Sequence, residues 1–171
     1  MERLPPLTLW TKVAYGIGSS CEAAKSFTFG IFLLFFYTSV LGLSGTAVAV
    51  ATGFGVAWDS TIDPVVGYWS DNTRTRYGRR HPFMLIGSVL MGASFFAIFT
   101  PPAGSSSAFL FVWLIATSLM LRTTSSIFQV PYFALGAELN PDYHGRTSIS
   151  AYRAAGGLVA TMAAAAVAVT V

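Results

Sequence analysis

Two long stretches without a charged side chain constrain the fold of this chain more than any other feature. Residues 27–58 and 82–121 contain no Lys, Arg, Asp or Glu, and each is interrupted by only one turn-like break. A helix needs about 20 apolar residues to cross the hydrocarbon core of a bilayer. Backbone polar groups in lipid must be satisfied within the segment, which favours helices. We therefore predict an all-α membrane protein.

The composition excludes an ordinary soluble domain. Of the 171 residues, 54% are hydrophobic and 10% are charged, whereas soluble domains carry about 25% charged residues. The single cysteine, Cys21, excludes an internal disulfide. The net charge of +3 comes from basic residues that lie beside apolar spans, so we expect membrane lipid, and no nucleic acid, as a partner.

Turn and breaker residues divide the chain into five predicted spans. The connection Gly42–Gly45 ends the first span, and Pro101–Pro102 ends the third. The spans cover about residues 12–40, 46–69, 83–100, 108–135 and 147–171. The fifth is still apolar at the last residue and is dense in alanine and glycine, which allow close helix packing. We expect the chain to be a truncated part of a longer protein.

The distribution of basic residues predicts the orientation. The N-terminal segment and the loops after spans two and four carry basic residues, whereas the loops after spans one and three have none. The seven basic residues are Arg3, Lys12, Arg74, Arg76, Arg79, Arg80 and Arg146. By the positive-inside rule, the N-terminus is cytoplasmic. We expect a multi-pass protein of the plasma or inner membrane.

Six ionisable residues fall within the predicted spans. They are Glu22, Lys25, Asp59, Asp63, Arg122 and Arg153. An ionisable group at membrane depth is costly and is a functional candidate by default. The structural alternative is that the three acids and three bases neutralise one another in ion pairs that lock helices together.

Asp59 and Asp63 form the sharpest candidate among these groups. They are four residues apart, so their Cβ atoms lie about 6 Å apart on one helix face. Two ionised carboxylates repel in a low dielectric, so either one takes a proton or a cation lies between them. Hard cations such as sodium prefer oxygen ligands, and transporters place coupling-ion sites near the membrane midplane. The pair therefore predicts a sodium or proton site.

The Asp-x-x-x-Asp pattern also occurs in membrane-embedded prenyl- and phosphatidyltransferases, where it holds magnesium and a diphosphate. Such an enzyme needs further acidic ligands. Glu22 is the one other acid within a span, and the loop acids Asp71, Glu138 and Asp142 are isolated. We expect no enzyme and no cofactor beyond the coupling ion, with a magnesium-dependent transferase as the weaker alternative.

The loop after the second span carries the most specific pattern of the chain. Its marked residues are Gly67, Asp71, Arg76, Gly78, Arg79 and Arg80. Headgroup binding accounts for the arginines, but it does not account for the spacing of the glycines and the acid. The pattern resembles the loop signature of the major facilitator superfamily, with extra residues between acid and glycine. This resemblance implies a cytoplasmic gate, in which acid and arginines stabilise one face of the alternating-access cycle.

Five segments together resemble the glycoside–pentoside–hexuronide:cation symporter family. They are Lys12-x-x-Tyr15-Gly16-x-Gly18, Trp58-Asp59-x-x-x-Asp63-Pro64-x-x-Gly67, Val130-Pro131-Tyr132, Ala134 to Leu139, and Arg146-Thr147 with Ala151-Tyr152-Arg153. They stand in family order over nearly the whole chain. The resemblance implies twelve spans in two six-helix bundles. This chain would hold about five helices of the N-terminal bundle and would need the missing C-terminal bundle as a partner.

The same resemblance assigns candidate roles to particular residues. It implies a cation site of Asp59, Asp63 and Ser126, with Arg153 in solute binding. Galactoside-transporting members carry two further aspartates, matched here by Ala23 and Gln129. Their stacking tryptophan is matched by Phe133, and an asparagine beside the cation site is matched by Ile62.

These departures change the expected solute chemistry. Gln129 still donates and accepts hydrogen bonds, and Phe133 still offers an apolar face to a sugar ring. Glu22 and Lys25 are further solute-binding candidates, although Glu22 is turned by about 100° from position 23. The remaining candidate solutes are a different sugar, a glycoside and a lipid-like molecule.

We predict a secondary active transporter that couples sodium or proton movement to uptake of an organic solute. The leading candidate for that solute is a sugar or glycoside. A non-transporting fragment of such a transporter is the alternative, because half a transporter lacks the bundle that closes the pathway.

Overall fold

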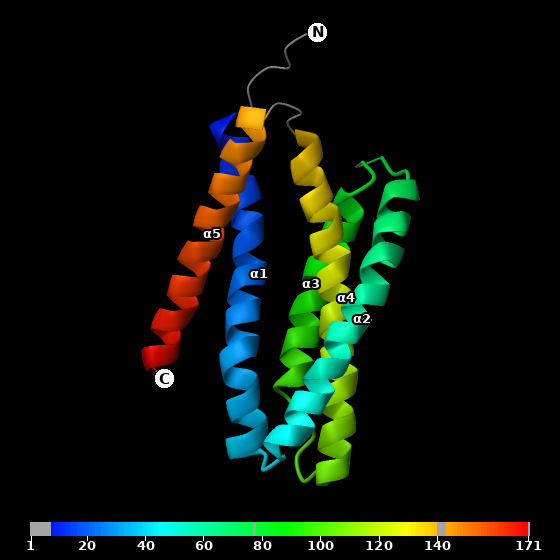
Figure 1. The fold of residues 1–171 in the computed structure, drawn as a ribbon, viewed down its shortest axis with the longest axis vertical. Coiled ribbons are helices and arrows are strands. Elements are labelled where there is room, and N and C mark those ends of the chain that lie inside the picture. The colour runs from blue at the N-terminus through cyan, green and yellow to red at the C-terminus, as the bar shows by residue number, and fades with distance from the viewer. Residues whose placement is uncertain (1–7, 77, 140–142, 171) are drawn as a thin grey trace. The chain divides into compact units, whose positions relative to one another are not determined.

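The computed structural model describes residues 8–76, 78–139 and 143–170, and this part of the chain is helical without a strand (Figure 1). Its helices are α1 (Leu9–Phe35), continued by the π-helical turn η1 (Phe36–Val40), then α2 (Gly45–Asn72), α3 (His81–Ile98), α4 (Ser107–Leu139) and α5 (Tyr143–Thr170). The predicted all-α fold class is confirmed.

The turns that end these helices follow from the residues at their ends. Gly42 and Gly104 adopt φ values of +73° and +75°, a left-handed backbone conformation that glycine enters without steric cost. Ser44 then caps α2, because its hydroxyl oxygen accepts from the Ala47 N–H over 3.3 Å. The helical segment of α1 and η1 thus ends in the predicted connection Gly42–Gly45, and Ser44 adds a cap that the sequence prediction did not include.

Helix limits and membrane limits are different quantities in this chain. The helix α4 runs through Pro131 and ends at Leu139, beyond the predicted span limit at residue 135. Among the described residues, three segments are long and apolar enough to cross a membrane: Leu9–Val40, His81–Ile98 and Ser107–Leu139. The membrane limits of the five spans stay predictions.

The chain divides into two compact units. The first unit contains the chain up to Ile31 and from Phe133 onward, and the second contains Phe32–Tyr132. The first unit brings together two segments that are far apart in sequence, whereas the second is one continuous segment, and each is described by itself.

Small residues let α1 and α5 approach closely in the first unit. A Cβ atom on Gly156 would lie 2.2 Å from the carbonyl oxygen of Gly16, so a larger residue does not fit. Beside this contact, the Ser19 hydroxyl donates to the Arg153 carbonyl over 2.7 Å, and the Ser20 hydroxyl donates to the Gly156 carbonyl over 3.0 Å. Small and hydroxyl residues at a helix interface are typical of packing in lipid.

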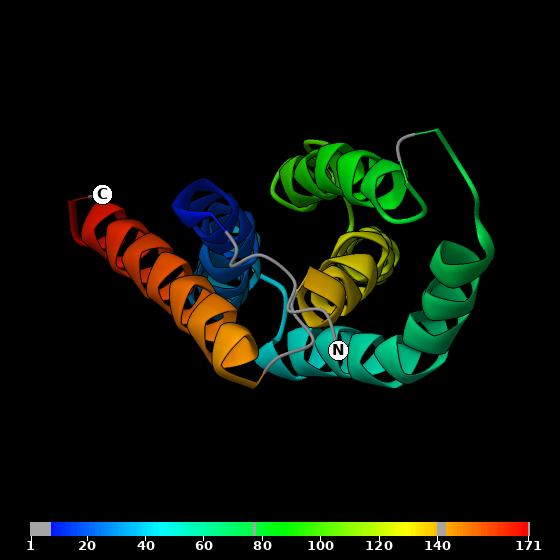
Figure 2. The same ribbon diagram turned by 90° about the horizontal axis from the view of Figure 1, so that it is seen from above.

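The second unit packs α2, α3 and α4 together, and Figure 2 shows α4 between α2 and α3. The buried Tyr37 hydroxyl donates to the Ile98 carbonyl over 2.8 Å. At Gly87 of α3, a Cβ atom would lie 2.7 Å from the Phe128 nitrogen of α4. Close backbone contact between α3 and α4 therefore depends on that glycine.

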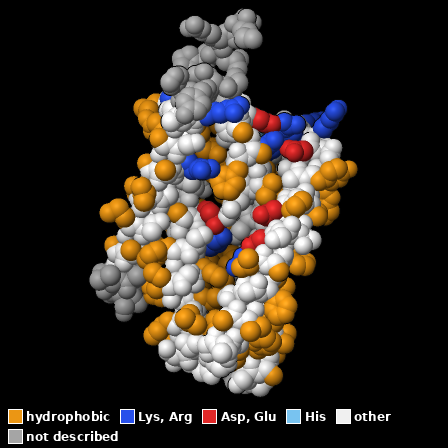
Figure 3. Space-filling model, in the orientation of Figure 1, with side chains coloured by type: hydrophobic (Ala, Val, Ile, Leu, Met, Phe, Trp, Pro, Cys, Tyr) orange, Lys and Arg blue, Asp and Glu red, His pale blue; other side chains and the backbone are white. Residues whose placement is uncertain are grey.

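Large apolar side chains remain exposed on the second unit, including Phe54 and Val56 of α2 and Leu85 and Phe96 of α3. Figure 3 shows hydrophobic side chains spread over the visible surface and basic side chains gathered where α2 joins α3. A surface of this kind is typical of helices that contact lipid or further helices.

Candidate ion and solute sites

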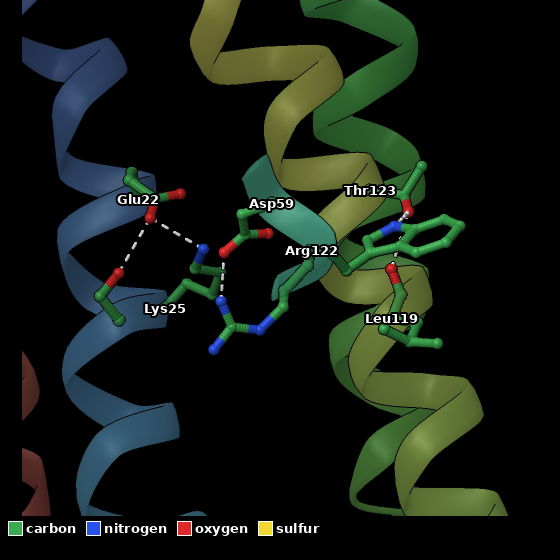
Figure 4. A network of polar contacts seen from close by, with 8 residues as sticks. Glu22, Lys25, Asp59, Leu119, Arg122 and Thr123 are labelled. Carbon is green, nitrogen blue, oxygen red and sulfur yellow. Dashed lines mark hydrogen bonds and ion pairs between the residues drawn. The ribbon is translucent and has the colours of Figure 1, made fainter. Parts of the chain in front are cut away.

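Polar contacts between α2 and α4 form the centre of the candidate ion site (Figure 4). Arg122 of α4 donates from Nη1 to Oδ2 of Asp59, so the two side chains form an ion pair. One residue away on each helix, the Trp58 indole N–H donates to Thr123 Oγ1 over 2.9 Å. These adjacent contacts fix the register of α2 against α4 and hold Arg122 opposite Asp59.

Gly55 leaves the space through which Arg122 reaches Asp59. A Cβ atom at position 55 would lie 2.1 Å from Nε and 2.4 Å from Cδ of Arg122. Position 55 is one turn before Asp59, so both lie on one face of α2, and Asp63 follows one turn later. The Arg122 side chain therefore lies over Gly55 and ends at Asp59, and it does not pair with Asp63.

Asp63 and Ser126 are placed differently from Asp59. The Asp63 side chain is exposed, and it makes no hydrogen bond or ion pair with any described residue. Ser126 is buried on α4 and has no described hydrogen bond to either aspartate. The described part of the chain also contains no cluster of three or more His, Cys, Asp or Glu side chains that could hold a metal. Within the described ranges, the two aspartates therefore share one helix face without a third acidic ligand.

The predicted gate residues lie at the joint of α2 and α3. Asp71 Oδ1 accepts from Arg80 Nη2 over 3.0 Å, and the Arg80 side chain is 8% exposed against 55% for Asp71. Gly78 has a φ of +88°, so a residue with a side chain would be strained there. The structure thus brings the acid together with one arginine of the Gly-Arg-Arg sequence.

The other gate residues have separate surroundings. Arg76 and Arg79 are exposed. Gly67 faces α4, because a Cβ atom there would meet Val130 Cγ1 at 3.6 Å, which is ordinary contact distance. Gly67 is therefore a packing position that a small side chain could also fill.

A cavity of about 210 Å³ lies in the first unit between α1, the end of α4 and α5. Its lining residues are Tyr15, Phe133, Gly136, Ala137, Arg146, Ile149, Ser150 and Arg153. The Arg153 guanidinium carbon lies 5.0 Å from the centre of the Phe133 ring, a cation–π distance. Two residues predicted to bind solute, from different helices, therefore meet in one cavity.

The remaining solute candidates do not line this cavity. Lys25 Nζ lies 2.8 Å from Glu22 Oε1 on α1, and the Ser26 hydroxyl donates to the same oxygen over 2.9 Å (Figure 4). Glu22 and Lys25 thus neutralise each other within one helix. Gln129 belongs to the second unit, where it is half-buried and has no described hydrogen bond.

Sequence reasoning included Arg122 among the charged residues of the spans but did not assign it to Asp59, and it did not single out Gly55. The contact joins residues 63 positions apart, which no local pattern specifies. The available signal was a glycine one turn before the first aspartate, on the same helix face.

Comparison with known proteins finds a family of transporters and several symporters. The chain matches the family model described as MFS/sugar transport protein over residues 14–171. An uncharacterized symporter of Synechocystis sp. is 32% identical over 84% of this chain and 27% of its own length. The sodium-dependent lysophosphatidylcholine symporter 1-A of Danio rerio is 31% identical, over 89% and 28%. The inner membrane symporter YicJ of Escherichia coli is 28% identical, over 91% and 35%.

These relatives are named as symporters, which are transporters rather than enzymes. The chain spans roughly a third or less of the length of each. Because the family model covers almost the whole chain and the relatives are named as symporters, the chain belongs to the MFS/sugar transport protein family, among the glycoside–pentoside–hexuronide:cation symporters of the major facilitator superfamily.

Proposed function

We propose that this chain is the ion-binding part of a cation-coupled symporter, in which Asp59 and Asp63 of α2 bind the coupling ion. The observation that carries this proposal is the pair of carboxylates on one face of α2, of which Asp63 has no described partner. An unpaired carboxylate within a predicted membrane span is costly unless a cation visits it. A sodium-dependent relative supports sodium as that ion, with a proton as the alternative.

The ion proposal is tested by thermal unfolding of the complete transporter in sodium chloride and in choline chloride at equal ionic strength. We expect sodium to raise the midpoint of unfolding, because a ligand that binds only the folded state stabilises it. Asp63→Asn should remove most of that increase. Ser60→Ala is the matched control, since Ser60 is an exposed α2 residue without a described side-chain contact.

A full sodium response in Asp63→Asn would exclude Asp63 as an ion ligand. A wild-type protein that ignores sodium but accumulates solute under an imposed pH gradient would assign the proton instead.

For the solute we propose an organic molecule that contacts Arg153 and Phe133 in the cavity of the first unit. The description of the matching family supports a sugar or glycoside. An amphiphile with a phosphate-bearing head is the second candidate. One relative is named for lysophosphatidylcholine, and the cavity is lined by two arginines, Arg146 and Arg153, whose guanidinium groups suit phosphate.

The solute proposal is tested by screening sugars, glycosides and lysophospholipids for sodium-dependent thermal stabilisation of the complete transporter. For the compound that stabilises, we expect Arg153→Gln to weaken its apparent affinity by about tenfold, the loss of about 1.4 kcal/mol of binding free energy. Arg74→Gln is the control, because Arg74 is exposed, lies outside the cavity and is not among the predicted gate residues. Unchanged affinity in Arg153→Gln would remove Arg153 from the solute site.

A further inference from the structure

We infer that Arg122 acts as a built-in competitor of the coupling cation, holding Asp59 in the ion-free state and leaving it when the cation binds. This inference rests on the proposed ion-binding function of Asp59 and Asp63. It adds a residue of α4 to the coupling machinery and a reason for the glycine at position 55.

The first observation is the position of the positive charge. Arg122 reaches the Asp59 carboxylate directly, on the face of α2 that also carries Asp63. A guanidinium on this carboxylate and a metal ion bound to it offer the same neutralisation, so the two compete for one group. Asp63 has no such partner among the described residues and stays available to attract the incoming ion.

The second observation is that Arg122 is held incompletely. Its Nη1 atom donates to Asp59, but its Nε atom is buried and has no hydrogen-bond partner in the described part of the chain. A buried donor without a partner costs about 1–3 kcal/mol. The ion pair is therefore weaker than a fully hydrogen-bonded one, as an exchangeable contact requires.

The third observation is that the passage of Arg122 depends on Gly55. The Nε and Cδ atoms of Arg122 lie where a Cβ atom of residue 55 would stand, at 2.1 and 2.4 Å. An alanine at this position would displace the flexible Arg122 side chain from Asp59, but the protein would still contain the arginine and its positive charge. Position 55 thus controls the pairing without touching the carboxylate.

Replacement of Arg122 by the cation at Asp59 would couple ion binding to the contact between α2 and α4. While Arg122 neutralises Asp59, the site presents one free carboxylate instead of two. When a cation binds between the aspartates, the Arg122 charge is released from α2. A contact between α2 and α4 is then present in one state and absent in the other, so ion binding changes the free energy of the contact between these helices.

The experiment measures the sodium concentration that gives half of the maximal thermal stabilisation of the complete transporter, with sodium replaced by choline. We expect Arg122→Gln to lower this concentration by about tenfold, since removal of a competitor worth about 1.4 kcal/mol strengthens binding by that factor. Arg122→Lys should stay near wild type, because it keeps a cation in place.

Gly55→Ala provides a second, independent variant that keeps the arginine. It should also lower the half-maximal sodium concentration, because it displaces Arg122 from Asp59. Gly53→Ala is its matched control on the same helix, since a Cβ atom at Gly53 meets nothing within 4 Å.

The outcomes separate this inference from the function on which it rests. A wild-type protein without any sodium response would refute the proposed sodium site, and with it the exchange. A normal wild-type response that is unchanged or weakened in both Arg122→Gln and Gly55→Ala would overturn the exchange alone and make Arg122 a purely structural partner of Asp59.

Discussion

Arg80 and Arg76 show how differently two arginines of one loop are used. Both were predicted as gate residues from their place in the loop pattern. Arg80 is buried and lies 3.0 Å from Asp71, whereas Arg76 is exposed. A buried guanidinium depends on its carboxylate for compensation, and an exposed one is compensated by water.

At the residue scale we therefore predict that Arg80→Gln lowers thermal stability, while Arg76→Gln leaves it within error of the wild type. Asp71 is half-exposed, so we expect an interaction free energy of only about 1 kcal/mol for the pair in a double-mutant cycle with Asp71→Asn. The cycle is measured by equilibrium unfolding of the four proteins. Equal effects of the Arg76 and Arg80 substitutions would show that the ion pair contributes nothing specific.

The limits of sequence reasoning are also clearest at this scale. The facing of Asp59 and Asp63 follows from helix geometry alone, and spacing was enough to predict it. The ion pair of Asp59 with Arg122 depends on the register of α2 against α4, which Trp58 and Thr123 set through their side chains. Local periodicity carries no information on such a register, so the partner of Asp59 could not be predicted.

At the scale of elements, single backbone positions decide how closely helices pack. Gly156 and Gly157 are neighbours on α5 with different surroundings. A Cβ atom at 156 would lie 2.2 Å from the Gly16 carbonyl oxygen, but at 157 the nearest atom would be Ala23 Cβ at 3.7 Å. The small-residue composition of α5 predicted close packing, but it did not tell which glycine is essential.

This difference gives a matched pair of variants. Both Gly156→Ala and Gly157→Ala gain helix propensity of about 1 kcal/mol. Only Gly156→Ala adds an overpacking penalty, which we expect to be about 1–3 kcal/mol. Equilibrium unfolding in detergent should find Gly156→Ala less stable than Gly157→Ala by that amount. Equal stabilities would contradict direct packing of α1 against α5 at this point.

At the scale of the whole molecule, the open question is the orientation of the chain in the membrane. The seven basic residues predict that the α2–α3 connection is cytoplasmic and that the α3–α4 connection, around Gly104, is on the opposite side. Sequence alone supplies this prediction, because orientation is set during insertion by charge and not by packing.

The orientation is tested with single cysteines in a protein that carries Cys21→Ser. In intact cells, a membrane-impermeant thiol reagent should label Ser106→Cys and should not label Thr75→Cys. Permeabilised cells should label both, which controls for accessibility. The reverse pattern in intact cells would place the N-terminus outside and would remove the positive-inside argument.

Pro64 within α2 has a mechanical consequence for the ion site. A proline in a helix removes one backbone hydrogen bond and bends the helix at that point, and α2 curves along its length in Figure 2. Both aspartates precede Pro64, whereas Asp71 follows it. The backbone group that Pro64 leaves without its helical hydrogen bond is the carbonyl of Ser60, which lies between Asp59 and Asp63. Bending at this joint can therefore change the distance between the two ion ligands as well as tilt the end that carries Asp71.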